Sequence, residues 1–161
     1  MIVILMGVAG AGKTTVGRLL AAELGWEFYD ADDFHPPANV EKMSGGVALS
    51  DGDRAPWLEA LRGLVRDRLA RGESAVLACS ALRESYRRDY LLLDGRVALF
   101  HLRGDRDTLL RRLSERRGHF MRPEMLDGQL AALEEPARET HLDISLPPGE
   151  IVKLIRLRLG V

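Results

Sequence analysis

IVILMGVAGAGKT, residues 2–14, is the stretch that decides the fold. Residues 2–6 are all apolar, which is typical of a strand buried on both faces of a parallel sheet. Residues 7–14, GVAGAGKT, match the pattern G-x-x-x-x-G-K-[ST], and apolar residues at helical spacing follow. A glycine-rich turn between a strand and a helix N-terminus can wrap phosphate groups with its backbone N–H groups. The stretch therefore predicts a phosphate-binding loop.

Specific roles follow for this loop. Lys13 is expected to reach the β- and γ-phosphates of a nucleotide, and Thr14 to place its hydroxyl on Mg²⁺. The residues expected to contact the nucleotide here are Gly7, Ala9, Gly10, Ala11, Gly12, Lys13, Thr14 and Thr15. The alternative is a glycine-rich turn with a chance lysine, which the strand before it and the helix after it disfavour.

Strands and helices are predicted to alternate along the rest of the chain. Apolar runs predict further strands at 26–30, 75–79, 96–102 and near 142–145. Helical spacing and stop signals predict helices at 13–25, 38–43, 55–71, 83–92, 105–117, 124–134 and 149–159. Such alternation indicates right-handed βαβ units, and so an α/β fold with a parallel sheet sandwiched by helices. We expect one domain over 1–161, since no linker or repeat interrupts it.

Composition narrows the class of protein. A net charge of −1 suggests neither a nucleic-acid groove nor a membrane-binding face, so we expect no nucleic acid and no membrane among its partners. The apolar run at the start is too short to span a bilayer and lacks the basic region of a secretory signal. The single cysteine, Cys79, excludes an internal disulfide framework and is interpreted as a small buried hydrophobe. We expect a cytoplasmic protein.

Missing motifs exclude two classes of phosphate-loop protein. The sequence contains neither the DxxG nor the NKxD pattern of a GTPase. The predicted strand 75–79 ends in Cys79-Ser80, where an ATP-driven motor would usually carry a Walker B aspartate. Small phosphotransferases remain, in which positioning and charge neutralisation supply most of the catalysis. Metal control would then rest on Thr14, Asp30 and the ATP phosphates.

FYDADDFHPP, residues 28–37, is the first candidate for the acceptor side. Asp30 closes the second predicted strand, and ligands of a parallel sheet bind at the carboxyl ends of its strands. A kinase acting on an alcohol needs a carboxylate to orient the hydroxyl and accept its proton, and oxygen ligands for Mg²⁺. Asp30 and Asp32 can point to one side, one toward the metal and the other toward the acceptor. The alternative is that these aspartates, Asp33 above all, are turn and N-cap residues before Pro36.

A second polar cluster follows at Lys42, Asp51, Asp53 and Arg54. The planar guanidinium of Arg54 suits a substrate carboxylate. Two alternatives stay open: Arg54 can form a surface ion pair with Asp51 or Asp53, and Asp53 can cap the next helix. Trp57 is interpreted as a core residue.

These stretches together resemble the gluconokinases of the small P-loop type, which are relatives of shikimate kinase. The resemblance covers essentially the whole chain and is carried by GVAGAGKTT, DADDFHPPANVEKMSGGVALSDGDRAPWL, CSALRESYR, LSERRGHFMRPEML and LEEP. The second of these is the specific one, because a phosphate loop alone would fit many kinases.

The resemblance implies ATP-dependent phosphorylation of D-gluconate at its 6-hydroxyl, with Mg²⁺. By analogy, Asp32 orients or deprotonates the hydroxyl, Asp30 helps to hold Mg²⁺ through water, and Arg54 meets the carboxylate of the acceptor. The resemblance gives the segment 31–58 as the acceptor-binding part. Its further acceptor-side candidates are His35, Lys42, Ser80 and Arg83.

The resemblance also implies a lid at roughly 117–136. Arg116 would lie near the adenine and phosphates, and Arg122 would swing in to neutralise charge in the transition state. The other arginines here, Arg111, Arg112 and Arg117, are interpreted as a solvated helix face. The family further suggests a homodimer.

Two rival functions remain at this point. One is a related kinase for another small hydroxy acid, such as a shikimate-like acceptor. The other is a nucleotide-binding regulator that closes on ATP without phosphorylating a small molecule.

Overall fold

The computed structural model describes residues 1–116 and 122–161, and the strands in this part of the chain form one sheet. Its order is β2-β3-β1-β4-β5, and every neighbouring pair is parallel. The strands are β1 (Ile2–Met6), β2 (Glu27–Asp30), β3 (Ala75–Ala78), β4 (Val97–Arg103) and β5 (His141–Asp143). All of β1 is buried, because it is the central strand and both of its faces are covered.

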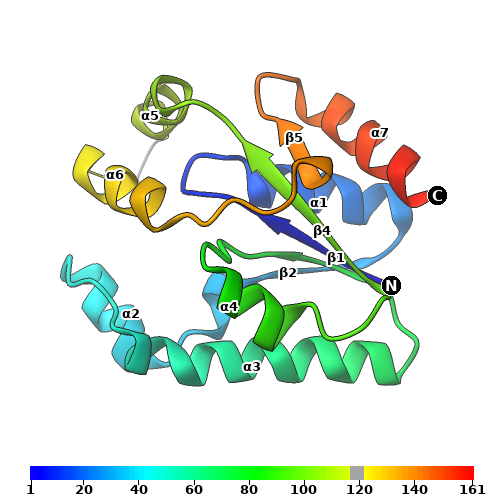
Figure 1. Cartoon of the computed structure of the whole chain (residues 1–161), viewed down its shortest axis with the longest axis horizontal. Helices are drawn as coiled ribbons and strands as arrows, with labels where there is room; N and C mark the ends of the chain where they lie inside the picture. The colour runs from blue at the N-terminus through cyan, green and yellow to red at the C-terminus, as the bar shows by residue number, and fades with distance from the viewer. Residues whose placement is uncertain (117–121) are drawn as a thin grey trace.

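Helices cover the two faces of the sheet (Figure 1). Helices α1 (Lys13–Leu24) and α7 (Pro148–Leu159) pack on one face, where Val3 and Leu5 of β1 join their core. Helix α3 (Asp51–Ala70) packs on the other face, against Ile2, Ile4 and Met6. The alternation of side chains along β1 thus divides the core into two layers. The predicted α/β fold, with a parallel sheet sandwiched by helices, is confirmed.

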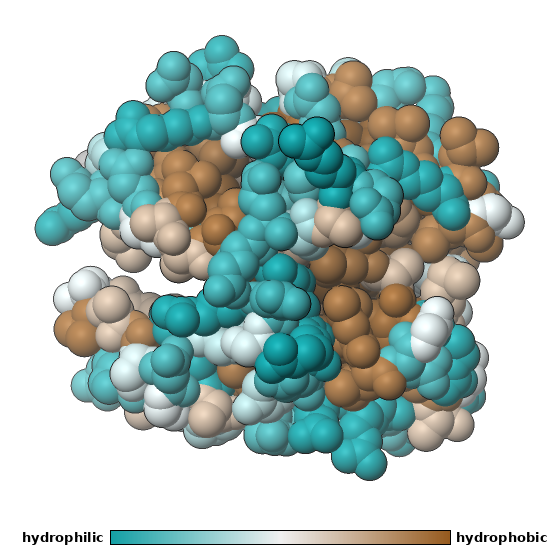
Figure 2. All heavy atoms as spheres, viewed as in Figure 1, coloured by the Kyte–Doolittle hydropathy of each residue, from teal (hydrophilic) through white to brown (hydrophobic). Residues whose placement is uncertain are grey.

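The other helices of the described residues lie either on the α3 side of the sheet or at the carboxyl end of its strands. On the α3 side lie α4 (Glu84–Tyr86) and a π-helical turn, η2 (Arg87–Leu91). At the end toward which the strand arrows point lie α2 (Pro37–Ser44), α5 (Arg106–Ser114) and α6 (Pro123–Ala132) (Figure 1). Two short 3-10 turns are η1 (Ala31–Phe34) and η3 (Arg138–Thr140). Figure 2 shows a cleft between the part built by α5 and α6 and the part built by α2.

The start of α3 corrects one sequence prediction. The sequence was expected to continue as loop through Asp53 and to form a helix from 55, but α3 begins at Asp51. Ser50 is the N-cap and forms a capping box with Asp53, which satisfies the first free N–H groups of the helix. Pro56 is therefore inside the helix and not in its first turn. The expectation that Asp53 helps to cap this helix is confirmed.

Other boundaries agree more closely with the prediction. Helix α1 ends at Leu24, and Gly25 caps it with a φ of 67°, the left-handed conformation expected of a glycine after a helix. Cys79 is buried with 2% of its surface exposed, as predicted for a small hydrophobe. Within residues 1–116 and 122–161, no helix has the length and apolar character needed to cross a membrane.

Candidate active site

The loop between β1 and α1 has the geometry of a phosphate cradle. Gly10 and Gly12 have φ values of 83° and 91°, which favour glycine, and α1 begins at Lys13. The Lys13 ammonium lies over the loop and donates hydrogen bonds to the carbonyl oxygens of Gly7, at 2.9 Å, and Val8, at 3.1 Å. Burial lowers the pKa of Lys13, and the nearby carboxylates of Asp32 and Asp30 oppose that shift. A bound phosphate would offer this ammonium a stronger acceptor than two carbonyls.

One N–H group of the loop already has a partner from a distant helix. The backbone N–H of Ala9 donates to Oε1 of Gln129, on α6, at 2.7 Å. In this structure the N–H of Ala9 is therefore not free to meet a phosphate.

The side-chain oxygens of Thr14 and Asp30 meet where the phosphate loop faces the end of β2. The Thr14 hydroxyl donates to Oδ2 of Asp30 at 3.0 Å, and the other Asp30 oxygen, Oδ1, accepts from the N–H of Asp32 at 3.1 Å. A threonine hydroxyl beside a carboxylate is a donor set that fits Mg²⁺, which also takes phosphate oxygens and water as ligands. Among the described residues no group of three or more His, Cys, Asp or Glu side chains forms a metal site.

Asp32 lies next to this pair, in the short turn η1. It keeps access to solvent, yet desolvation by the surrounding chain and the negative charge of Asp30 raise its pKa above the ordinary value. The positive charge of Lys13 acts in the opposite direction. Asp32 therefore combines a basic carboxylate with a position beside the lysine of the phosphate loop.

His35 and Trp57 form a stacked pair behind Asp32. Their ring centroids are 4.5 Å apart and the planes differ by 11°. The Trp57 indole N–H donates to the carbonyl oxygen of Ala31 at 2.7 Å, which anchors α3 to η1. Trp57 is 6% exposed and belongs to the core, as predicted from the sequence.

Arg54 lies on the first turns of α3, where Asp51 partly neutralises it. Their closest atoms, Nη1 and Oδ1, are 3.5 Å apart, which is the ion pair that sequence reasoning left open. The Tyr86 hydroxyl donates to the same Asp51 oxygen at 2.8 Å, and the positive charges of Arg83 and Arg54 both help to lower the pKa of Asp51. Two arginines and a tyrosine thus gather around one carboxylate near His35, whose pKa responds to Arg54.

Lys42 is engaged differently from the other candidates. Its ammonium contacts both carboxylate oxygens of Asp53 at 2.9 Å, so it holds α2 against the first turn of α3. The backbone hydrogen bond from Ser50, and after it the contact with Lys42, lowers the pKa of Asp53 to about 2.

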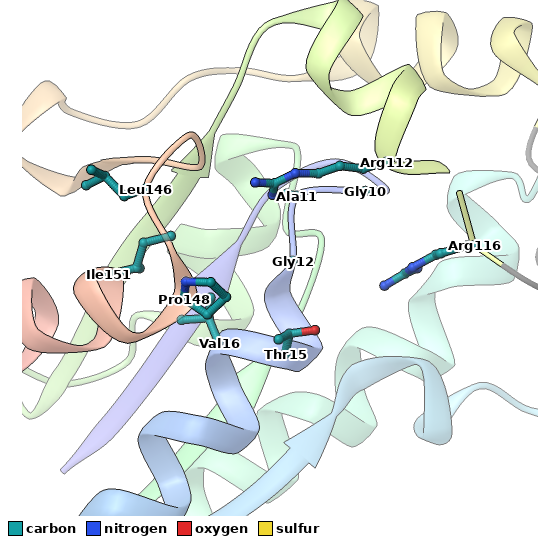
Figure 3. A pocket seen from close by; sticks show the side chains of 10 residues that line it. All are labelled: Gly10, Ala11, Gly12, Thr15, Val16, Arg112, Arg116, Leu146, Pro148 and Ile151. Atoms are coloured by element: carbon teal, nitrogen blue, oxygen red, sulfur yellow. The ribbon is translucent and has the colours of Figure 1, made fainter. Parts of the chain in front are cut away.

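A pocket of about 170 Å³ lies on the other side of the phosphate loop (Figure 3). Arg112, in the last turn of α5, and Arg116, just after this helix, line it; in this view Arg112 lies beside Ala11 and Arg116 lies to the right of Gly12. Its far wall is made by Leu146, Pro148 and Ile151, at the start of α7. Apolar walls, a guanidinium group and an adjoining phosphate cradle suit a nucleotide whose base enters this pocket.

Known proteins share both the sequence and the fold. A family profile described as "Shikimate kinase" matches residues 9–143. A "Probable gluconokinase" of Xenopus tropicalis is 46% identical, over 94% of this chain and 91% of the relative. The "Gluconokinase" of Gluconobacter oxydans (strain 621H) is 48% identical, over 83% of this chain and 75% of the relative. The chain belongs to the gluconokinase family. The crystal structure of a gluconokinase from Sinorhizobium meliloti 1021 has a TM-score of 0.83 at 41% identity, over 96% of this chain and 91% of that one.

In this gluconokinase-family chain, most of the residues predicted to form the site lie at one end of the sheet. Ser80 follows β3 there, and its carbonyl oxygen accepts from the N–H of Gly7 at 3.4 Å. Arg83 is the N-cap of α4 and is exposed. Arg122 is exposed too, at the N-cap of α6. Arg117 and the start of the predicted lid, 117–121, lie outside the described residues.

Sequence reasoning about this gluconokinase-family chain was wrong on Arg112. Its guanidinium does not belong to a solvated face, because it lines the pocket and donates to the carbonyl oxygen of Ile144. Arg111, one position earlier, is exposed as expected. Pro148 and Gln129 were missed as well. A proline pair at 147–148 before a helix was a usable signal for the pocket wall, whereas nothing in the sequence marks Gln129.

Proposed function

We propose that this protein transfers the γ-phosphoryl group of ATP to the 6-hydroxyl of D-gluconate, giving 6-phospho-D-gluconate and ADP. Membership of a kinase family implies ATP as the co-substrate, and the relatives named above are gluconokinases. The observation that carries the proposal is the position of Asp32. Its carboxylate lies within the electrostatic reach of both the phosphate-loop lysine and His35.

The reaction assigns Asp32 the role of general base. As the gluconate O6 attacks the γ-phosphorus, Asp32 takes the hydroxyl proton, the new O–P bond forms and the bond to the ADP oxygen breaks. A carboxylate with a raised pKa is a better proton acceptor than an ordinary aspartate, which is why the desolvation of Asp32 supports the assignment. The Lys13 ammonium would stabilise the negative charge that develops on the phosphate oxygens in the transition state.

Arg54 and Arg83 are proposed to receive the gluconate carboxylate. Asp51 holds Arg54 only at 3.5 Å, a weak contact that a bidentate substrate carboxylate can replace. Lys42 has a smaller part in this proposal, since its ammonium is already held by both oxygens of Asp53. Ser80 follows β3, and its proposed role is to face the path of the phosphoryl group.

The nucleotide side of the proposal uses the pocket at the end of α5. Arg116 would lie against the base and phosphates, and Arg122 would approach the transferring phosphoryl group from the lid proposed at 117–136. Thr14 and Asp30 would hold Mg²⁺, which would neutralise charge on the ATP phosphates. A single domain, a homodimer, a cytoplasmic location and the absence of nucleic-acid and membrane partners remain predictions.

A coupled ADP-release assay across an acceptor panel tests the proposed function. The panel contains D-gluconate, shikimate and other small hydroxy acids, each with ATP and Mg²⁺. We expect the highest kcat/KM with gluconate, because the relatives named above are gluconokinases. Arg54 and Arg83 would offer two planar donors to the carboxylate that every acid in the panel carries.

Two outcomes would favour the rival functions instead. Turnover of another acid without turnover of gluconate would assign the chain to a different acceptor. ATP binding without phosphotransfer to any acid would support the nucleotide-binding regulator.

A further inference from the structure

Asn39 is a buried polar residue without a role in the chemistry so far. It lies on α2, is 3% exposed, and its amide nitrogen makes two contacts. Nδ2 donates to the carbonyl oxygen of Asp53 at 2.8 Å and lies 3.2 Å from Nδ1 of His35. The side chain therefore links the start of α3 to the ring that stacks on Trp57.

The carbonyl of Asp53 determines which way the Asn39 amide faces. A backbone carbonyl oxygen only accepts hydrogen bonds, so the amide NH₂ must face it; the flipped amide would place two oxygens against each other. The NH₂ group carries two hydrogens, and its second one is then available to His35 Nδ1. Nδ1 is consequently an acceptor. A neutral imidazole with an accepting Nδ1 carries its proton on Nε2.

The ring is also held in place and kept uncharged. Stacking on Trp57 sets its plane, and Trp57 is itself anchored to Ala31 through its indole N–H. Desolvation and the positive charge of Arg54 lower the pKa of His35, while the Asp32 carboxylate acts in the opposite direction. Desolvation is the largest of these effects, so the pKa of His35 is lowered overall, which favours the neutral ring.

The geometry points to His35 as a neutral Nε2–H donor to a hydroxyl oxygen of the acceptor, with Asn39 as the positioning residue that sets its tautomer. This inference rests on the proposed function, since the acceptor is taken to be a polyhydroxy acid. The division of labour has a physical reason. Arginines recognise the carboxylate by charge, whereas a hydroxyl oxygen needs only a neutral donor.

The contact with Asn39 also bears on the charge of the ring. By using up Nδ1 as an acceptor, Asn39 disfavours the doubly protonated form of His35.

Nitrogen NMR of the histidine-labelled protein, without substrate, tests the tautomer. We expect the His35 ring to show an unprotonated Nδ1 and a protonated Nε2, assigned by the signals that disappear in His35→Gln. A protonated Nδ1 in the wild-type protein would overturn the inference. Asn39→Asp removes the donor and leaves only acceptors, so the same ring should then gain a proton on Nδ1. An unchanged ring in a folded Asn39→Asp protein would show that Asn39 does not set the tautomer.

A matched pair of variants tests the donor role by activity. In His35→Gln the amide nitrogen can replace Nε2, whereas in His35→Asn the shorter side chain places it near Nδ1. Both variants lose the ring that stacks on Trp57, so only the difference between them reports the donor. We expect the gluconate KM of His35→Asn to exceed that of His35→Gln by about tenfold, the cost of one lost hydrogen bond. The KM for ATP should not change in either variant.

Each result of the pair is decisive. An equal loss in both variants would show that only the stacked ring matters, which would overturn the donor role. If the wild-type protein turns over no gluconate, the proposed function fails, and the NMR result still decides the tautomer because it needs no substrate.

Discussion

Gln129 of α6 accepts a hydrogen bond from the backbone N–H of Ala9 in the phosphate loop, at 2.7 Å and across 120 positions of sequence. The loop is thus tied to α6, a helix within the proposed lid segment 117–136. A loop that must hold phosphates with its N–H groups is in this way steadied by a side chain that lies 120 positions away in the sequence.

Two substitutions of Gln129 should have different effects, one on the stability of the fold and the other on nucleotide binding. Gln129→Leu leaves the part-buried N–H of Ala9 without an acceptor, and we expect it to lower the free energy of unfolding by about 1–2 kcal/mol. Gln129→Glu keeps an acceptor oxygen but adds negative charge beside the phosphate loop. It should retain stability and raise the KM for ATP several-fold. Urea denaturation and steady-state kinetics give the two numbers, and wild-type stability of Gln129→Leu would contradict the role of this contact.

Asp32→Asn should reduce kcat strongly while ATP still binds. The amide keeps the shape of the carboxylate but cannot take the hydroxyl proton, and general-base catalysis contributes about 10²–10⁴-fold. Single-turnover kinetics and an ATP-binding titration measure the two properties separately. A rise in the gluconate KM with kcat unchanged would show that the base assignment is wrong.

Arg54→Ala should weaken gluconate binding more than ATP binding. Loss of a charge-assisted, bidentate contact is expected to raise the gluconate KM by about 10–100-fold. Arg62→Ala is the matched control, because Arg62 forms the same i,i+3 ion pair on the same helix, at 3.7 Å from Glu59. Both KM values should stay unchanged in the control. Equal losses for gluconate and ATP in Arg54→Ala would indicate a structural role.

His101 should make the fold acid-sensitive. This β4 residue is 1% exposed, stands edge-on to His141 at 5.0 Å, and has an Nδ1 without a partner among the described residues. Burial first, and then the charge of His141, lowers the pKa of His101 from 6.5 to about 4. Below pH 6.5 the unfolded chain binds a proton that the folded one does not, so stability falls as the pH drops toward 4.

The expected loss from His101 is about 2 kcal/mol between neutral pH and pH 5, since each pKa unit corresponds to about 1.4 kcal/mol. Urea denaturation over this range measures it. His101→Phe, which removes the titrating group, should flatten the dependence by that amount. The same slope in both proteins would assign the acid sensitivity to other residues.

Gly17→Ala should destabilise the protein, although alanine is the better helix former. A Cβ at Gly17 would lie 2.6 Å from Cε2 of Phe28, so α1 could not pack as closely on β2, and overpacking costs about 1–3 kcal/mol. Gly63→Ala on α3 is the control. Nothing lies within 4 Å of its Cβ, and we expect it to stabilise the fold by about 0.5–1 kcal/mol. Two changes of the same sign in urea denaturation would contradict the packing argument.

Local patterns in the sequence were sufficient for the architecture. A continuous apolar run predicted the central strand, because a strand covered on both faces has no polar positions to alternate with. The phosphate loop follows from a glycine pattern between a strand and a helix, and the end of α1 follows from Gly25. Helix α3 shows the limit of such reasoning, because Pro56 suggested a start near 55 while the capping box of Ser50 and Asp53 begins the helix a turn earlier.

The sequence by itself therefore determined the fold class, the phosphate loop, the family and the residue types at the acceptor side. Each of these can be recognised from a short stretch of sequence. The tertiary structure alone decided which partners these residues have. Arg112 faces the pocket and not solvent, Gln129 reaches Ala9, and the carbonyl of Asp53 orients Asn39 and so the proton of His35. The reason is physical: a side chain's hydrogen-bond partner is set by the packing of separate elements, which no local periodicity encodes.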